Sequence, residues 1–499
     1  MMEIRPSPVE FTRLAKQATV VPVWGELLAD LDTPVSAFLK LDDGKTSFLL
    51  ESVEGEEKVA RFSFLGSRPK LLFKSRGRDI EVIERLGTGR LQVTRYQTTR
   101  DPLAEIERLM ARFRVVPTPP LPRFYGGLVG YLGYNTARFI ERLPAHQVDP
   151  FQVPDIMLML TESMVIFDHA QHKMFLVVNA FVHEGQLAAS YRRARSQIAA
   201  MARRLTARSA PRRMPRRARH HANTPVRSNL SKRQFAQMVT RAKGSIRAGD
   251  IIQVVLSQRF ERPFRCAPLD VYRALRSLNP SPYMYFLRFG SMCLVGSSPE
   301  MLVRCEDGRI ETRPIAGTRR RGLDHQEDER LIHQLLQSPK ERAEHLMLVD
   351  LGRNDLGRVA QTGSVQTPEF MVVEKYSHVV HLVSSVRARL RRGKTAFDVL
   401  RAAFPAGTVT GAPKVRAIEI IAELERDDRG PYAGAVGYVS FSGNLDTCIT
   451  IRTILVHRGM AYVQAGAGIV ADSQAAREYQ ETCNKARGML KAIELAESG

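Results

Sequence analysis

The stretch GAVGYVSFSGNLDTCITIRTILVHRGMAYVQAGAGIV, residues 434–470, decides the fold class. It holds three segments rich in β-branched and aromatic residues, at 434–441, 447–456 and 460–466, separated by short connections that contain glycine or asparagine. Such runs are typical of strands, and strands joined by short connections pair antiparallel. The stretch therefore predicts an extended antiparallel sheet.

The sequence on either side extends this pattern. Alternating or short apolar runs predict further strands at 46–53, 61–67, 70–75, 173–181 and 251–260, and Asp307-Gly308 predicts a hairpin turn. Apolar residues at helical spacing predict helices at 231–250, 327–351, 395–404, 413–426 and 473–497. In GGLVGYLGY, residues 126–134, we interpret the glycines as positions of close backbone packing. The predicted fold class is α+β, with large antiparallel sheets flanked by helices.

An arginine-rich segment divides the chain. Residues 192–227 hold 12 arginines with no lysine and no acid, and so supply more than half of the net charge of +22. The segment has no aromatic residue to stack on bases, which favours the end of a helix followed by a solvated linker over a nucleic-acid-binding arm. We predict a β-rich N-terminal region at 1–190, a basic linker at 191–228 and a catalytic domain at 229–499. Deleting 192–227 with a replacement linker should then leave function intact.

Composition excludes several classes of protein. No uninterrupted apolar run is long enough to span a bilayer, and the first 32 residues lack the pattern of a signal peptide. The five cysteines are scattered, without zinc-ligand spacing or a disulfide framework. These features predict a reduced cytoplasmic protein that needs neither membrane nor nucleic acid.

Two predicted helices carry carboxylates three residues apart. Ser338-Pro339 predicts a helix start, with Glu341 able to close a capping box and Glu344 on the same face. Glu478 and Glu481 repeat the spacing near the C-terminus. Each pair alone is explained by a solvated helix face. If the two helices face each other, however, the carboxylates form an open oxygen site that suits Mg²⁺.

Other motifs fit a small anionic ligand. Gly466 and Gly468 in VQAGAGIV, and Gly317 in PIAGT, let a backbone approach an anion closely, although glycines at strand ends also serve turns. Arg452 lies among apolar residues and needs an anionic partner, which a structural salt bridge could also supply. His381 borders an apolar run, where a core histidine is the alternative. Together the motifs predict a pocket for a polyanion bridged by Mg²⁺.

In this order along the chain, PIAGTRRRG, AEHLMLVDLGRNDLGR, HLVSSV, GAPK, DTCITIRT, VQAGAGIV and ETCNKA resemble the motifs of the chorismate-utilising enzymes. The resemblance covers residues 230–495 and reaches the N-terminal region through LLES (49–52) and GGLVGYLGY. It implies an α/β fold that buries the site between sheets, with both regions packed into one body.

The resemblance implies a role for each matching residue. Glu344 and Glu481 would bind Mg²⁺ and the ring carboxylate of chorismate, with Glu341 and Glu478 close behind. Glu300 would protonate the departing C4 hydroxyl, and His381 would assist the loss of pyruvate. The residues implied to bind chorismate are Gly317, Thr318, Tyr432, Arg452, Gly466, Ala467 and Gly468.

Two positions indicate which reaction is catalysed. Many aminodeoxychorismate synthases have a nucleophilic lysine where this chain has Ala316, and isochorismate and salicylate synthases have a water-activating lysine where it has Gln253. With neither lysine, ammonia is the expected nucleophile, and anthranilate and pyruvate are the expected products. Formation of aminodeoxychorismate is the alternative.

A partner and an inhibitor are also implied. No cysteine stands in a Gly-x-Cys-x-Gly elbow, so ammonia from glutamine would require a separate glutamine amidotransferase subunit. LLES and NPSPYM resemble the tryptophan feedback site of the family, with Ser52 and Pro282, Tyr283 and Met284 lining it. Ordinary packing of a strand and a turn is the alternative for both motifs.

Overall fold

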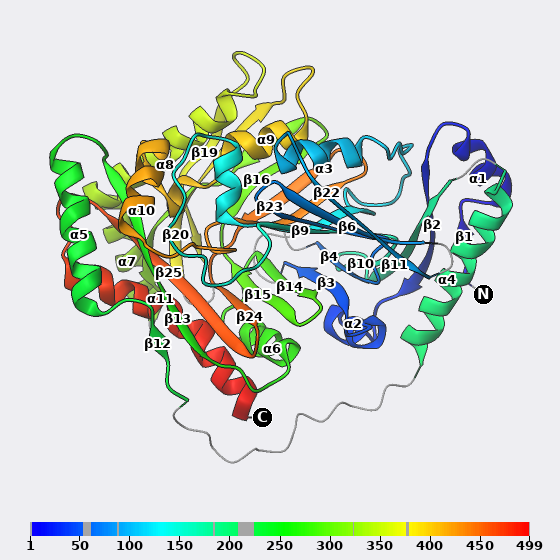
Figure 1. Ribbon diagram of the computed structural model, residues 1–499, viewed down its shortest axis with the longest axis horizontal. Coiled ribbons are helices and arrows are strands. Elements are labelled where there is room, and N and C mark those ends of the chain that lie inside the picture. Colours follow the sequence, from blue (N-terminus) through cyan, green and yellow to red (C-terminus); the bar gives the residue numbers. More distant parts are fainter. Residues whose placement is uncertain are drawn as a thin grey trace.

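The computed structural model describes residues 2–52, 61–86, 89–182, 185–207, 224–322, 324–375 and 379–498. Within them the strands form two large sheets, and all of the paired strands that extend these sheets are antiparallel. The predicted α+β class is confirmed (Figure 1). No helix in the described ranges is long and apolar enough to cross a membrane.

The first sheet has 13 strands, ordered β1-β2-β11-β10-β4-β3-β14-β15-β24-β25-β13-β12 with β21 beside β13. Their bounds are β1 Ile4–Arg5, β2 Val20–Leu28, β3 Thr46–Glu51, β4 Phe62–Ser67, β10 Ser163–Asp168, β11 Lys173–Phe181, β12 Arg227–Ser228, β13 Gln253–Pro263, β14 Tyr283–Phe289, β15 Met292–Ser298, β21 Gly411–Ala412, β24 Thr453–His457 and β25 Met460–Ile469.

The second sheet has 12 strands, ordered β18-β20-β17-β16-β23-β22-β8-β9-β5-β6-β7 with β19 beside β20. Their bounds are β5 Leu71–Arg76, β6 Asp79–Arg85, β7 Leu91–Gln97, β8 Gly127–Leu132, β9 Ile156–Leu160, β16 Met301–Glu306, β17 Arg309–Thr312, β18 Ile315–Arg320, β19 Gln366–Lys375, β20 Val379–Arg389, β22 Ala435–Ser440 and β23 Leu445–Ile449.

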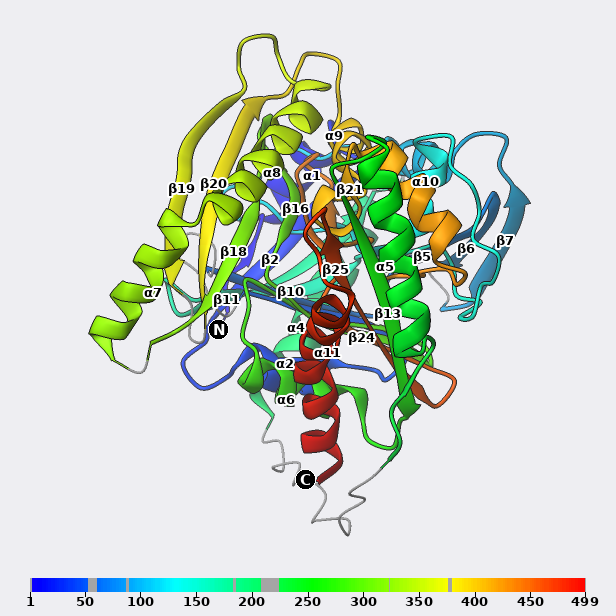
Figure 2. The same cartoon turned by 90° about the vertical axis from the view of Figure 1, so that its left-hand side faces the viewer.

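Helices cover the outer face of each sheet, and an apolar core fills the space between the sheets. The inner core combines side chains of both sheets, such as Phe64 and Leu294 of the first with Val129 and Met157 of the second. Helices α1, α2, α4, α6 and α11 pack on the first sheet and α3, α8 and α9 on the second (Figure 2). The helical bounds are α1 Pro8–Ala15, α2 Pro34–Leu41, α3 Pro102–Met110, α4 Leu187–Thr206, α5 Lys232–Arg247, α6 Pro268–Leu278, α7 His325–Gln337, α8 Pro339–Gly357, α9 Ala396–Ala403, α10 Lys414–Leu424 and α11 Ala475–Ser498, with 3₁₀ turns η1 Tyr134–Phe139 and η2 Gly407–Val409.

The predicted division at the basic segment does not divide the sheets. Strand β3 of the N-terminal region pairs with β14, and β8 pairs with β22, so each sheet contains strands from both sides of the segment. The glycines of GGLVGYLGY allow this pairing. A Cβ on Gly127 would lie 2.1 Å from the carbonyl oxygen of Val439, and one on Gly130 would lie 2.0 Å from that of Met157. The packing interpretation of these glycines is confirmed.

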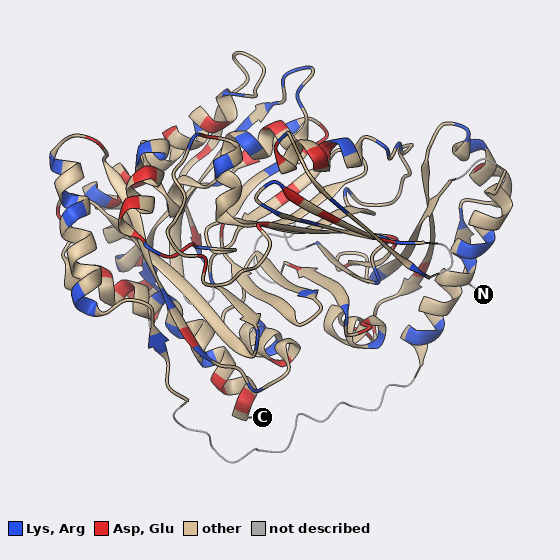
Figure 3. Cartoon of the chain, viewed as in Figure 1, with Lys and Arg blue, Asp and Glu red and all other residues tan. Residues whose placement is uncertain are grey.

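The linker predicted at 191–228 begins too early in the chain. Residues 191–206 continue helix α4, whose Tyr191, Ala194, Ile198 and Leu205 are buried against the first sheet. The arginines of α4 lie on its other faces, visible as blue segments in Figure 3. Residues 208–223 lie outside the described ranges. A deletion of 192–227 would remove buried turns of α4, so the structure argues against the expectation that this deletion is harmless.

Three predicted elements are interrupted. The helix predicted at 327–351 is two helices, because Ser338 ends α7 and caps α8 while Pro339 occupies the first turn of α8. The strand predicted at 447–456 is β23 and β24, with Arg452 between them at a φ of 51°. VQAGAGIV, expected to follow a strand, lies largely within β25. The Asp307-Gly308 hairpin is confirmed, since both residues have positive φ between β16 and β17.

Candidate active site

A cavity of about 620 Å³ lies where the two sheets meet helices α8 and α11. Strands β13 and β25 of the first sheet, and β18 and β20 of the second, contribute to its wall. The predicted site residues that line it are Gln253, Glu300, Gly317, Glu341, Glu344, His381, Tyr432, Arg452, Gly466, Gly468, Glu478 and Glu481. Ala467 is buried and does not line the cavity, and the side chain of Thr318 is outside what the structure describes.

The two carboxylates of α8 are held differently. Ser338 accepts a hydrogen bond from the backbone of Glu341, but the Glu341 carboxylate binds Arg319 at 2.9 Å instead of returning to the cap. The predicted capping box is therefore absent. Glu344 lies one turn further into the cavity and accepts a hydrogen bond from the amide of Gln253. Burial, followed by the charge of Glu341, raises the pKa of Glu344.

Helix α11 brings the second pair of carboxylates to the same cavity. Glu481 forms an ion pair with Lys485 at 2.7 Å, one turn along the helix. Burial raises the pKa of Glu478, and the charge of Glu481 adds to this shift. The charge of Glu481 also contributes to the raised pKa of Glu344, so the two helices interact electrostatically across the cavity.

The described residues hold no group of three His, Cys, Asp or Glu side chains close enough to form a metal site. Glu344 and Glu481 nevertheless come from opposing helices and face one cavity. Mg²⁺ is commonly held by one or two carboxylates, with the remaining positions filled by water and substrate oxygens. Burial, followed by the like charge of Glu341, raises the pKa of Glu344, and a divalent cation would relieve the repulsion between the carboxylates. The donor set therefore fits a magnesium ion that completes its shell with substrate.

Arg452 lies where the chain passes from β23 of the second sheet to β24 of the first sheet. Its backbone adopts the left-handed conformation there, and its guanidinium donates to the carbonyl of Lys485 at 3.2 Å. Among the described residues no carboxylate forms an ion pair with it, and burial lowers its pKa. The alternative of a structural salt bridge is therefore wrong in this structure. A cation with lowered pKa that faces a cavity can bind an anionic ligand there.

The cavity glycines make room for side chains. A Cβ on Gly466 would lie 2.7 Å from the hydroxyl of Tyr432, and one on Gly468 would lie 2.4 Å from the amide nitrogen of Gln253. Gly317 has a φ of 63° at a register shift between β18 and β20, where a Cβ would approach Glu341. PIAGT is thus a bulge within a strand, not a strand end as the sequence suggested. The missing side chains let polar groups reach the cavity.

Burial shifts the pKa values of both Glu300 and His381. Burial raises the pKa of Glu300 to about 7, so its carboxyl group can hold a proton near neutral pH. Burial lowers the pKa of His381, which keeps the imidazole neutral, and its Nδ1 lies 3.4 Å from the carbonyl oxygen of Gly317. A raised carboxyl pKa in a cavity is typical of a general acid.

The buried ion pair that lies against Tyr432 was not predicted from the sequence. Arg429 and Glu425 form a fully buried ion pair at 2.7 Å, and the Arg429 guanidinium stacks over the rings of Tyr134 and Tyr432. The i,i+4 spacing of the pair was available as a signal. Lys485 was also missed as a site residue, although it stands four residues after Glu481, and its ammonium donates to the carbonyl of Gly466 at 2.9 Å.

The residues of the predicted tryptophan motif come together in a separate cavity of about 60 Å³. Ser52 follows β3, whose Glu51 pairs with Met284 of β14. Pro282, Tyr283 and Met284 line the same cavity as Ser52. The Ser52 hydroxyl is buried without a hydrogen-bond partner in the described ranges, so it has capacity to bind a ligand. The volume is too small for an indole ring without movement of the wall.

Comparisons with known proteins agree with this geometry. The model of a family described as chorismate binding enzymes matches residues 59–491. The chain is 48% identical to anthranilate synthase component 1 of Aquifex aeolicus, over 99% of each chain, and 46% identical to that of Pseudomonas aeruginosa, over 98% of each. The structure resembles anthranilate synthase component I of Streptococcus pneumoniae with a TM-score of 0.75 and 37% identity, over 93% of this chain and 98% of the other. The menaquinone-specific isochorismate synthase of Escherichia coli shares the fold at 20% identity, with a TM-score of 0.71 over 97% of this chain and 98% of the other.

Proposed function

The chain belongs to the chorismate-binding enzyme family, among the anthranilate synthase component 1 proteins, and we propose that it converts chorismate and ammonia to anthranilate and pyruvate. The single observation that carries the proposal is the cavity in which four helix carboxylates face Arg452 and Tyr432. Such a cavity suits a dicarboxylate that binds a cation through one carboxylate and an arginine through the other. The enzyme would be a lyase of tryptophan biosynthesis in the cytoplasm, in keeping with five unpaired cysteines.

Binding divides between the two ends of chorismate. Glu344 and Glu481 would hold Mg²⁺, which supplies positive charge to the ring carboxylate, with Glu341 and Glu478 behind them. Arg452 and the hydroxyl of Tyr432 would bind the enolpyruvyl carboxylate. This division is supported by the guanidinium of Arg452, which has no carboxylate partner among the described residues, and by the buried Arg429–Glu425 pair beside Tyr432. The backbone of 466–468 and of 317–318 would close the cavity around the ligand.

Proton transfer would begin at Glu300. Ammonia would add to C2 of chorismate while the ring double bonds shift and the C4 hydroxyl leaves as water with the proton of Glu300, and the new ammonium group would return a proton to Glu300. The neutral imidazole of His381 would then assist transfer of the C2 proton to the methylene carbon of the enolpyruvyl group, so that the C3–oxygen bond breaks and pyruvate leaves. Overall, chorismate and ammonia give anthranilate, pyruvate and water. The pKa of Glu300, raised to about 7 by burial, supports the role of proton donor.

The choice of nucleophile follows from two cavity residues. Ala316 and Gln253 both line the cavity, and neither can form a covalent adduct or activate water as a base. Ammonia needs neither a covalent intermediate nor a general base, because it is already nucleophilic when unprotonated. The alternative product is 4-amino-4-deoxychorismate, in which the amino group replaces the hydroxyl at C4 and the enolpyruvyl group is retained. We favour anthranilate because the relatives described above carry that name.

Glutamine would serve as the ammonia source only through a partner. None of the five cysteines lies in a nucleophile elbow, and burial raises the pKa of Cys293, Cys305 and Cys448, which disfavours a reactive thiolate. We therefore propose a separate glutamine amidotransferase subunit. We also propose that tryptophan inhibits the enzyme through the cavity of Ser52 and Pro282–Met284.

The test is incubation of the purified chain with chorismate, Mg²⁺ and an ammonium salt. Anthranilate, detected by its fluorescence, is the expected product, and 4-amino-4-deoxychorismate or isochorismate would contradict the argument from Ala316 and Gln253. Glutamine alone should be inert and should become a donor when a glutaminase subunit is added. Glutamine-dependent activity in the single chain would rule out the two-subunit arrangement.

A further inference from the structure

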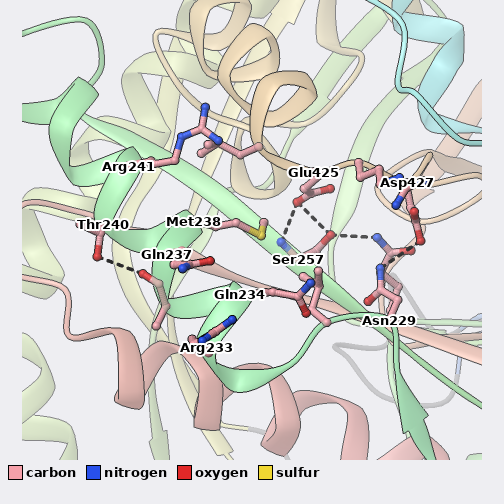
Figure 4. Close-up of a pocket in the computed structure, with 15 residues that line it drawn as sticks. Asn229, Arg233, Gln234, Gln237, Met238, Thr240, Arg241, Ser257, Glu425 and Asp427 are labelled. Atoms are coloured by element: carbon pink, nitrogen blue, oxygen red, sulfur yellow. Dashed lines mark hydrogen bonds between the residues drawn. The ribbon is translucent and has the colours of Figure 1, made fainter.

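An open groove of about 790 Å³ lies beside the active-site cavity. The groove is lined by one face of α5 and by residues 424–427 at the end of α10 and just after it (Figure 4). The strand pair β13–β25 contributes Ser257 and Gln464. None of the residues assigned above to chorismate or Mg²⁺ lines this groove. Its role is therefore separate from binding those ligands.

The groove and the cavity meet at Gln464, which lines both. Gly466 of β25 lies opposite Ser257 of β13, and Gly468 lies opposite Val255. Because alternate strand residues share a face, Gln464, Gly466 and Gly468 lie in a row on one face of the sheet. The two spaces are thus arranged end to end along that face, with the Gln464 side chain at their boundary.

The boundary is a short chain of hydrogen bonds. The Gln464 amide donates to the Ser257 hydroxyl at 2.8 Å, and the Ser257 hydroxyl donates to Glu425 at 3.1 Å. Figure 4 shows the contact between Ser257 of β13 and Glu425, the residue that follows α10. The side-chain oxygen of Gln464 is buried without a hydrogen-bond partner in the described part of the chain. A buried acceptor without a partner can accept an N–H donor that passes it.

The charges that line the groove favour the entry of a neutral molecule over that of a cation. Its two acids are already paired, Glu425 with Arg429 and Asp427 with Arg259. Three arginines also line the groove, Arg233, Arg241 and Arg426. None of them forms an ion pair with any described residue. The rim is therefore positive. It repels the ammonium ion and does not hinder neutral ammonia.

We propose that this groove is the entrance for ammonia and that Gln464 is its gate. The inference rests on the proposed function, since it names the route of the nucleophile in that reaction. Ammonia enters along α5, donates a hydrogen bond to the free oxygen of Gln464, and passes into the cavity as the amide turns away from Ser257. The route reaches the cavity at Gln464, near the middle of β25 and opposite Arg259, several residues along the strand pair from Gln253. Ammonia can thus enter while chorismate and Mg²⁺ occupy the carboxylate end.

The test measures the KM for ammonia and the KM for chorismate separately, with ammonium chloride at fixed pH. Met238→Trp adds bulk from α5 into the groove, and Gln464→Met removes the acceptor while keeping the length of the side chain. Each should raise the KM for ammonia by about tenfold or more and change the KM for chorismate by no more than about twofold. Gly244→Trp, on the same helix in open space, is the matched control and should change neither constant.

The outcomes separate the two proposals. If the wild-type chain makes no anthranilate from ammonium, the proposed function fails. If it does, and the folded variants keep the wild-type KM for ammonia, the entrance is wrong. A parallel rise in both constants would show a structural effect and would also overturn the gate. Should Met238→Trp not fold, Gln237→Trp, at an exposed position on the groove, provides the same obstruction.

Discussion

The side-chain amide of Gln253 on β13 donates a hydrogen bond to the carboxylate of Glu344 on α8, at 3.4 Å. The bond joins the first sheet to a helix that covers the second, at the position where the sequence resemblance places the lysine of isochorismate and salicylate synthases. A neutral amide can orient the carboxylate without competing with a cation for it. A lysine at this position would form an ion pair instead.

Gln253→Lys should therefore weaken the binding of Mg²⁺. The added ammonium would stabilise ionised Glu344 and occupy one of its oxygens, so the Mg²⁺ concentration for half-maximal activity should rise by about tenfold. The measurement is anthranilate formation as a function of Mg²⁺. Gln253→Met, which adds no charge, is the control. An unchanged Mg²⁺ dependence in the lysine variant would show that Glu344 does not bind the ion.

Glu344→Gln and Glu481→Gln should each abolish anthranilate formation. Each substitution removes a charged ligand and keeps the volume, and the Glu481–Lys485 pair is partly exposed and so contributes only about 0–1 kcal/mol to stability. The melting temperature should therefore hardly change. Glu423→Gln, on the exposed face of α10, is the control. A large loss of melting temperature with activity retained would show that these carboxylates are structural.

Glu300→Gln should lose activity and gain stability at alkaline pH. The pKa of Glu300 in the folded protein, about 7, lies above its ordinary value of 4.5, so the stability that the neutral acid contributes to the wild type is full below pH 4.5 and is lost as pH rises through 7. The variant carries no buried charge, so at pH 8 its free energy of unfolding should exceed that of the wild type by about 2–4 kcal/mol. Denaturant unfolding at pH 4 and pH 8 measures the difference. Equal pH dependence in both proteins would refute the shift.

The wild-type rate should also fall above pH 7 if Glu300 is the proton donor. The protonated carboxyl is the active form, and its population declines as pH rises through about 7. The profile of kcat measures this with chorismate saturating and the concentration of neutral ammonia held constant. A rate that stays level to pH 9 would exclude Glu300 as the acid.

Arg452→Met should raise the KM for chorismate without loss of stability. The guanidinium has no carboxylate partner among the described residues and its pKa is lowered by burial, so its removal leaves no charge unpaired. The KM should increase by about 10-fold to 100-fold, equivalent to about 1.4–2.8 kcal/mol of lost binding. Arg458→Met, on an exposed turn, is the control. A fall in melting temperature with unchanged KM would contradict a substrate role.

Ser52→Phe should reduce inhibition by tryptophan. The ring would fill the cavity between β3 and the turn at Pro282, where the Ser52 hydroxyl has no hydrogen-bond partner among the described residues. Tryptophan and chorismate should oppose each other's binding by the same factor, with a coupling of about 1–3 kcal/mol. The measurement is the tryptophan concentration for half inhibition, with the uninhibited rate as reference. A wild-type enzyme that ignores millimolar tryptophan would show that LLES is only a packed strand.

The sequence by itself determined the features that depend on neighbouring residues. The strand alternation, the Asp307-Gly308 turn, the cap at Ser338 and the i,i+3 pairs of glutamates are all local, because a helix repeats every 3.6 residues and a strand every two. The ordered motifs added the chemistry, since each presents a charge or a missing side chain within a few residues. The fold class followed from these local features, and the full set of cavity residues followed from the family resemblance that the motifs carry.

Only the tertiary structure decided where the chain changes sheets and which spaces adjoin. TCITIRTILV reads as one strand, but β23 joins the second sheet and β24 the first, and the turn at Arg452 points a cation into the cavity. Likewise β3 and β14 pair across more than 230 residues, and Gln464 borders two spaces because of its register with β13. The physical reason is that strand pairing is set by the burial of both sheet faces against distant segments. No local periodicity contains that information.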